Sequence, residues 1–89
     1  MLEIDVDLIV PVLVTLEQDG CSIYVPDFNI TAHGEDYIGA MANTIMVASA
    51  TYYYNLERNI KFEFKTTYAQ VQNMCKGKNQ FATFASLTK

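Results

Sequence analysis

Five carboxylates are the side chains of this sequence that could perform chemistry, because converging acidic residues can hold the two metal ions of a nuclease. They are Asp5, Asp7, Asp27, Glu35 and Asp36. Such a site needs ligands from several strands, including the last, and the last predicted strand contains no acid. A turn after Pro26 explains Asp27 better, and helix capping explains Asp36 better. We therefore expect no catalytic residues and no enzyme.

The other side chains with chemical potential also favour no active site. His33 is the only histidine and lacks a nucleophile or partner in the sequence, so we expect it on the surface or facing a partner. Cys21 and Cys75 are too few for a disulfide framework, and with one histidine they make no metal-ligand set. Four lysines lack the stacking pattern of nucleic-acid binders and are expected to be solvated: Lys61, Lys65, Lys76 and Lys78. No metal or cofactor is expected.

Charge is divided unevenly along the chain. The first 57 residues contain nine carboxylates and no lysine or arginine, whereas all six basic residues lie between Arg58 and Lys89 beside one acid, Glu63. The net charge of −4 hides this asymmetry. A stretch that carries only negative charge repels nucleic-acid phosphates and attracts basic proteins. We therefore expect a small acidic module that docks onto a basic protein and binds no duplex DNA on its own.

The length of 89 residues predicts a single domain, spanning 1–89. Apolar residues make up 51% of the chain, which is ample for a globular fold. The N-terminal segment is acidic where a secretory signal carries positive charge, and the longest apolar run, 8–14, is too short to span a membrane. We expect a cytoplasmic protein whose modest core benefits from assembly into a dimer or a higher oligomer.

Alternating apolar residues predict three strands in the first third of the chain. Residues 8–16 are apolar on both parities, which indicates a strand buried on one face and partly covered on the other. Asp19-Gly20 supplies a turn into a second strand, 21–25. Pro26-Asp27 ends that strand, and a third is predicted over 28–33. The short links make these strands an antiparallel meander.

A long helix is predicted from Tyr37 to about Leu56. Asp36 is a suitable N-cap, and no charge occurs between it and Glu57, so we do not expect the whole outer face to be solvated. One stripe at helical spacing is predicted to pack on the sheet: Ile38, Met41, Ala42, Ile45, Ser49, Tyr52 and Leu56. Four other residues are predicted to meet a second chain: Thr44, Val47, Thr51 and Tyr54.

The last third predicts a short helix and a fourth strand. Thr66 or Thr67 could cap a helix that continues through Cys75, and residues 80–86 alternate as a strand. The predicted fold class is therefore α+β: a three-stranded antiparallel meander, a long helix packed on the sheet, a short second helix and a fourth strand. The element order is β-β-β-α-(α)-β.

Three short motifs resemble the N-terminal domain of the HicB antitoxin family: a turn after the first strand, the end of the second strand and the start of the main helix. The matching residues are Val12, Val14, Asp19, Gly20, Tyr24, Pro26, Asp27, Phe28, Gly34, Asp36 and Ala40. Three features depart from the family. Asn29-Ile30-Thr31 replaces a P-G-C segment, Ile38-Gly39 replaces a pair of glutamates, and no DNA-binding module is found within these 89 residues.

The resemblance implies a partial RNase H-like fold, with the fourth strand placed beside the first. A right-handed crossover is expected to make that strand parallel to the third. The resemblance also implies a function, which is to bind and block a HicA-like toxin, a small basic protein that cleaves mRNA. The acidic first two-thirds of the chain suit such a partner.

A toxin-masking domain is expected to present carboxylates and aromatic rings near its second and third strands. The expected partner-binding residues are Tyr24, Asp27, Phe28, His33 and Glu35. Two alternatives remain open. One is an orphan structural domain that forms homo-oligomers through the uncharged helix or an exposed strand edge, with no toxin partner. The other, given little weight, is an enzyme of RNase H type.

Overall fold

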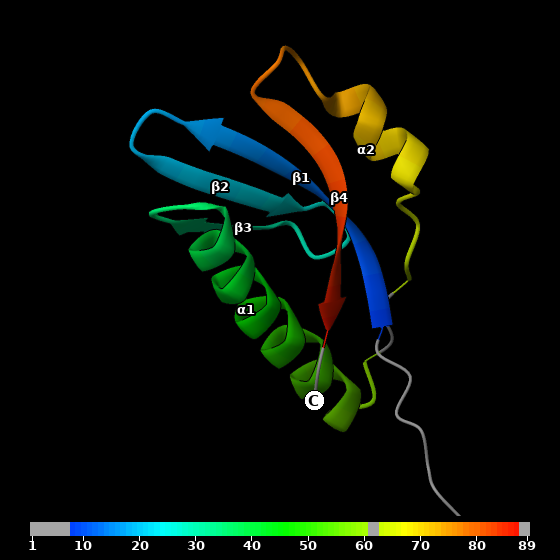
Figure 1. Cartoon of the computed structure of the whole chain (residues 1–89). Helices are drawn as coiled ribbons and strands as arrows, with labels where there is room; N and C mark the ends of the chain where they lie inside the picture. The colour runs from blue at the N-terminus through cyan, green and yellow to red at the C-terminus, as the bar shows by residue number, and fades with distance from the viewer. Residues whose placement is uncertain (1–7, 61–62, 88–89) are drawn as a thin grey trace, which may run out of the picture.

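The computed structural model describes residues 8–60 and 63–87. Its elements, in chain order, are β1 (Leu8–Glu17), β2 (Gly20–Val25), β3 (Ile30–Gly34), α1 (Tyr37–Glu57), α2 (Tyr68–Met74) and β4 (Gln80–Leu87). The strands form one antiparallel sheet in the order β3-β2-β1-β4 (Figure 1). The predicted α+β fold class and element order are confirmed.

β3 is shorter than predicted, because Phe28 belongs to a turn and not to the strand. The amides of Phe28 and Asn29 donate to the carbonyl oxygens of Val25 and Pro26, each at 3.2 Å. Asn29 has a φ of 54°, which asparagine adopts more readily than most residues. The alternation of Phe28 with Ile30 therefore continues through a turn, and pairing with β2 begins only at Ile30.

α1 begins where the sequence predicted. Asp36 Oδ1 accepts a hydrogen bond from the Gly39 amide at 2.7 Å, so Asp36 is the N-cap. Gly34 lets the first turn of the helix lie against β3, since a Cβ at Gly34 would fall 2.2 Å from the Ala40 nitrogen. No helix among the described residues is long and apolar enough to cross a membrane.

The face that α1 turns to the sheet differs from the predicted stripe. Ile38 and Leu56 were expected to pack on the sheet but are 78% and 52% exposed, whereas Thr44, expected to meet a second chain, is fully buried. The residues nearest the sheet, Ala40, Thr44 and Ala48, are small and let the helix approach closely. The Thr44 hydroxyl donates to the Ala40 carbonyl oxygen at 2.7 Å, so its burial leaves no unpaired donor.

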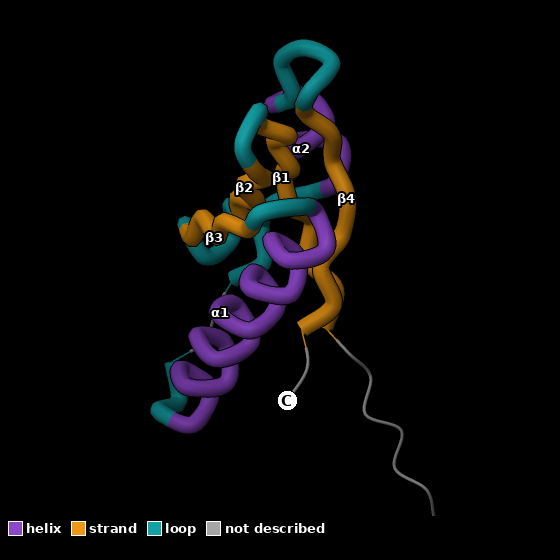
Figure 2. Tube along the Cα trace, turned by 60° about the vertical axis from the view of Figure 1, so that its left-hand side comes forward, coloured by secondary structure: helices purple, strands orange, loops and turns teal. Residues whose placement is uncertain are grey.

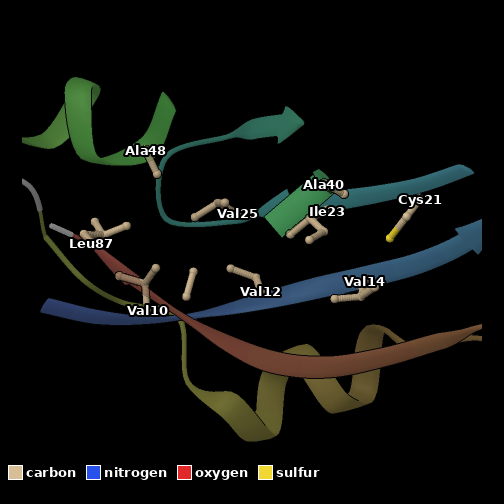
Figure 3. Close-up of a cluster of buried hydrophobic side chains, with 10 residues drawn as sticks. Val10, Val12, Val14, Cys21, Ile23, Val25, Ala40, Ala48 and Leu87 are labelled. Atoms are coloured by element: carbon tan, nitrogen blue, oxygen red, sulfur yellow. The ribbon is translucent and has the colours of Figure 1, made fainter. Parts of the chain in front are cut away.

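The core lies between the sheet and α1 (Figure 3). It consists of Val10, Val12, Val14, Cys21, Ile23, Val25, Ala40, Ala48, Ala85 and Leu87. Alternate residues of β1 and β2 enter it, which is why those strands were recognisable in the sequence. Each buried valine, leucine or isoleucine contributes about 1.5–3 kcal/mol relative to an exposed one.

α2 covers part of the opposite face of the sheet. The Thr67 hydroxyl accepts a hydrogen bond from the Gln70 amide at 3.2 Å, and Gln70 Oε1 accepts one from the Thr67 amide at 2.8 Å. This capping box confirms the predicted cap. Val71 is fully buried, and the Tyr68 ring stacks on Phe84 with 4.8 Å between centroids. Figure 2 shows α2 beside β1 and β4, away from α1.

β4 lies beside β1, as predicted, but it runs antiparallel to β1 and so also antiparallel to β3. Leu8 pairs with Leu87, and Thr15 pairs with Gln80. The expected parallel direction is therefore wrong. After α1, the connector and α2 carry the chain back along the sheet, and β4 starts from the opposite end (Figure 1). This second reversal departs from the strand direction that the RNase H-like resemblance implies.

Candidate partner-binding surface

The half of the second sheet face that α2 leaves uncovered is formed by β2 and β3. Ser22 and Tyr24 on β2 alternate with the core residues of that strand, and Thr31 and His33 on β3 pair directly with them in the sheet. Thr31 and His33 are exposed, and Ser22 and Tyr24 are half-buried. We call these four side chains the open face. It combines one aromatic ring with hydroxyl and imidazole groups, which suits recognition of a polar protein surface.

A hydrogen-bonded group orients the side chains at one end of the open face. The Ser22 hydroxyl donates to the Glu17 carboxylate and lies 2.9 Å from His33 Nδ1. The histidine therefore does have a partner, which the sequence did not reveal. The order differs from a catalytic triad, in which the histidine lies between the carboxylate and the hydroxyl. Here the serine is central and its proton goes to Glu17, so the arrangement holds His33 in place without activating a nucleophile.

Four carboxylates meet at the same end of the sheet, and we call them the acidic end. They are Glu17, Asp19, Glu35 and Asp36. The β1–β2 turn and the β3–α1 loop that carry them are in contact, since a Cβ on Gly20 would lie 2.6 Å from the Gly34 carbonyl oxygen. Burial raises the pKa of the nearby Cys21 thiol, and the charges of Glu17 and Asp36 raise it further. These carboxylates thus impose a local negative potential.

Basic residues do not neutralise the acidic end. Lys76 and Lys78 lie at this end of the sheet on the β4 side, where the Leu16 amide donates to the Asn79 carbonyl oxygen at 2.7 Å. Among the described residues, the one ion pair joins Lys65 and Glu63. The acidic end therefore remains available to cations from another molecule.

The structure brings together three of the five residues expected to bind a partner. Tyr24 and His33 belong to the open face, and Glu35 belongs to the acidic end beside it. The Tyr24 hydroxyl donates to Asn29 Oδ1 at 3.3 Å, which orients the ring. Glu17 and Ser22 were missed, although strand parity and the direct pairing of Ser22 with His33 could have placed them there.

Asp27 and Phe28 lie away from the other three and contact the body of the domain. Asp27 Oδ1 accepts hydrogen bonds from the amides of Lys65 and Thr66 at 3.2 and 3.0 Å, which ties the β2–β3 turn to the connector before α2. Asp27 Oδ2 is buried without a hydrogen-bond partner among the described residues. The Phe28 ring packs edge-on against Phe64, with 5.9 Å between centroids. Both residues hold the chain together at this end.

The carboxylates considered for a two-metal site are not gathered in one place within the described chain. Asp27 lies at the β2–β3 turn, whereas Glu35 and Asp36 lie at the acidic end, and Asp5 and Asp7 lie outside the described residues. No group of three or more potential metal ligands forms within residues 8–60 and 63–87. Of the four lysines considered for phosphate contacts, Lys61 also lies outside the described residues, and Lys65, Lys76 and Lys78 are exposed.

Comparison with models of protein families, with curated proteins and with solved structures gives no match.

Proposed function

We propose that this chain is a protein-binding module of the antitoxin type, which neutralises a small basic HicA-like toxin by masking its mRNA-cleaving surface. One observation carries the proposal: the unneutralised acidic end lies directly beside the open face of β2 and β3. A basic ribonuclease surface must attract RNA phosphates, and the same positive field attracts the acidic end. The aromatic and hydroxyl groups of the open face supply short-range contacts.

The part of the chain that resembles HicB antitoxins is also the part that builds this surface. The matching residues run from Val12 to Ala40, and this span contains β2, β3 and the start of α1. The antiparallel direction of β4 departs from the implied fold, but β4 is at the far edge of the sheet from β3. The departure therefore leaves the proposed binding surface intact.

The test is the association rate with the small basic protein encoded beside this chain, measured at low and high ionic strength. The variant is Asp19→Lys with Glu35→Lys, since neither carboxylate has a hydrogen-bond or ion-pair partner among the described residues. We expect association to slow about tenfold or more at low salt, with a smaller loss at high salt.

The matched control is Lys76→Glu with Lys78→Glu, which changes two exposed charges at the same end of the sheet. Association should stay unchanged or become faster, and circular dichroism should show an intact fold for both pairs. An unchanged rate for the acidic pair, or a neighbouring gene that encodes no basic protein, would overturn the proposal.

The alternative function is that of a structural domain that forms homo-oligomers without a toxin partner. The uncharged outer face of α1 favours self-association, and this face is compatible with either function because α1 lies on the side of the sheet opposite the open face (Figure 3). Toxin binding separates the two functions.

A further inference from the structure

The outer face of α1 exposes large apolar side chains over the whole length of the helix. Ile38, Met46 and Leu56 are 78%, 63% and 52% exposed, and no charged residue occurs between Asp36 and Glu57. Scattered single apolar residues are normal on a protein surface, but a continuous apolar patch marks an interaction site. The core already has its helix, so this second face of α1 calls for a partner from outside the chain.

A shallow open hollow of about 590 Å³ follows this face, and its lining includes Ala42, Met46, Ala50, Tyr53 and Leu56. The first four are spaced by four, four and three residues, so they lie in one line along the helix surface. Small and large side chains alternate along that line. This alternation gives the face bumps and gaps of matching size.

We propose that α1 packs antiparallel against α1 of a second copy of this chain. When Met46 of one copy lies over Ala50 of the other, the antiparallel arrangement also places Tyr53 over Ala42 and Leu56 beside Ile38. Each large side chain near the centre then meets a small one, which is how packed helices interdigitate. The same contacts occur twice, as a two-fold interface requires.

Charge favours a second copy over a basic protein as the occupant, and the antiparallel over the parallel arrangement. An uncharged face offers no counter-charge to a basic partner, and it adds no repulsion between two chains of net charge −4. Glu35 and Asp36 precede the helix, whereas Glu57 at its end is followed by Arg58. Antiparallel packing sets each acidic start beside an end that contains Arg58, whereas parallel packing would bring both acidic starts together.

This dimer does not rest on toxin binding, because α1 and the open face lie on opposite sides of the sheet. The test is sedimentation equilibrium of the full chain at micromolar concentration. We expect a mass of about 20 kDa, twice the 10.0 kDa of one chain. Ile38→Lys alone and Leu56→Glu alone should each lower the mass towards that of one chain.

Combining the two substitutions in one chain tests the antiparallel arrangement. The new charges are 18 residues apart, about 27 Å along the helix, so they cannot pair within one chain. Only antiparallel packing brings opposite charges together across the interface, so the double variant should recover the dimer mass at low salt. Parallel packing would set like charges together and give no recovery.

The control is Ile9→Lys, which charges another apolar residue, 60% exposed, on the opposite face of the sheet. It should leave the dimer mass unchanged, and circular dichroism should show native helix content for every variant. A wild-type chain that stays at 10 kDa, single variants that remain dimeric, or a double variant that does not recover would each overturn the proposal.

Discussion

The two faces of the sheet are built by different rules. The face under α1 is closed by valine, isoleucine and leucine side chains from β1, β2 and β4, together with small residues of the helix. The other face has a short helix over β1 and β4, with Val71 as its one buried residue, and β2 and β3 remain open. The comparison teaches that the first face determines the fold, which leaves the second free to carry a binding surface.

Adjacent residues of β2 should give the sharpest contrast between the faces. Ile23 is fully buried against α1, whereas Tyr24 points to the open face. Ile23→Ala should lower the free energy of unfolding by about 2–5 kcal/mol, because it removes buried methyl groups and leaves a cavity. Tyr24→Ala should cost less than about 1 kcal/mol, since it removes one exposed hydrogen bond. Urea unfolding measures both, and equal losses would refute the division into two faces.

The tie made by Asp27 should matter more than its place in a surface turn suggests. Asp27→Ala removes the acceptor for the amides of Lys65 and Thr66 and should cost about 1–3 kcal/mol. Asp27→Asn keeps an acceptor oxygen at that place and should cost clearly less. Hydrogen exchange at these two amides should rise in the alanine variant. If both substitutions have the same effect, the tie does not hold the connector to α2.

The smallest effect concerns the pH dependence of the closed face. Burial and then the charges of Glu17 and Asp36 raise the pKa of Cys21 above its ordinary value of 9.0. The folded state therefore holds the thiol proton more tightly than the unfolded state, so this contribution to stability is present below pH 9.0 and is lost as the pH rises further. Unfolding free energies of the wild type and Cys21→Ala should converge above that pH. A constant difference would contradict the shift.

The closed face could be predicted from the sequence more fully than the placement of α1. Alternation in β1 and β2 named their buried residues, since a strand places alternate side chains on opposite faces. The helix stripe was assigned by hydrophobicity, which favoured Ile38 over Thr44. Close packing against the sheet selected small residues instead, and size is not visible in a hydrophobic pattern. The direction of β4 was missed because it depends on the path of the connector in space.

The candidate site could be predicted only in part because its residues converge through strand pairing. Tyr24, His33 and Glu35 were found from the resemblance and from their places near the strand ends. The contact between Ser22 and His33 depends on register, and the acidic end depends on two loops meeting at Gly20 and Gly34. Asp27 looked like a solvent-facing turn residue, because its bond partners lie 38 and 39 positions later in the chain.

The pairing of β1 with β4 has a consequence for synthesis on the ribosome. The second strand of the sheet to form contacts with β1 is encoded more than 60 positions later, as the pairing of Thr15 with Gln80 illustrates. Until β4 emerges, one edge of β1 is an unpaired apolar template, and the core lacks Ala85 and Leu87. The nascent chain must therefore wait for β4 before it can fold cooperatively, and during that interval it is a natural client for chaperones.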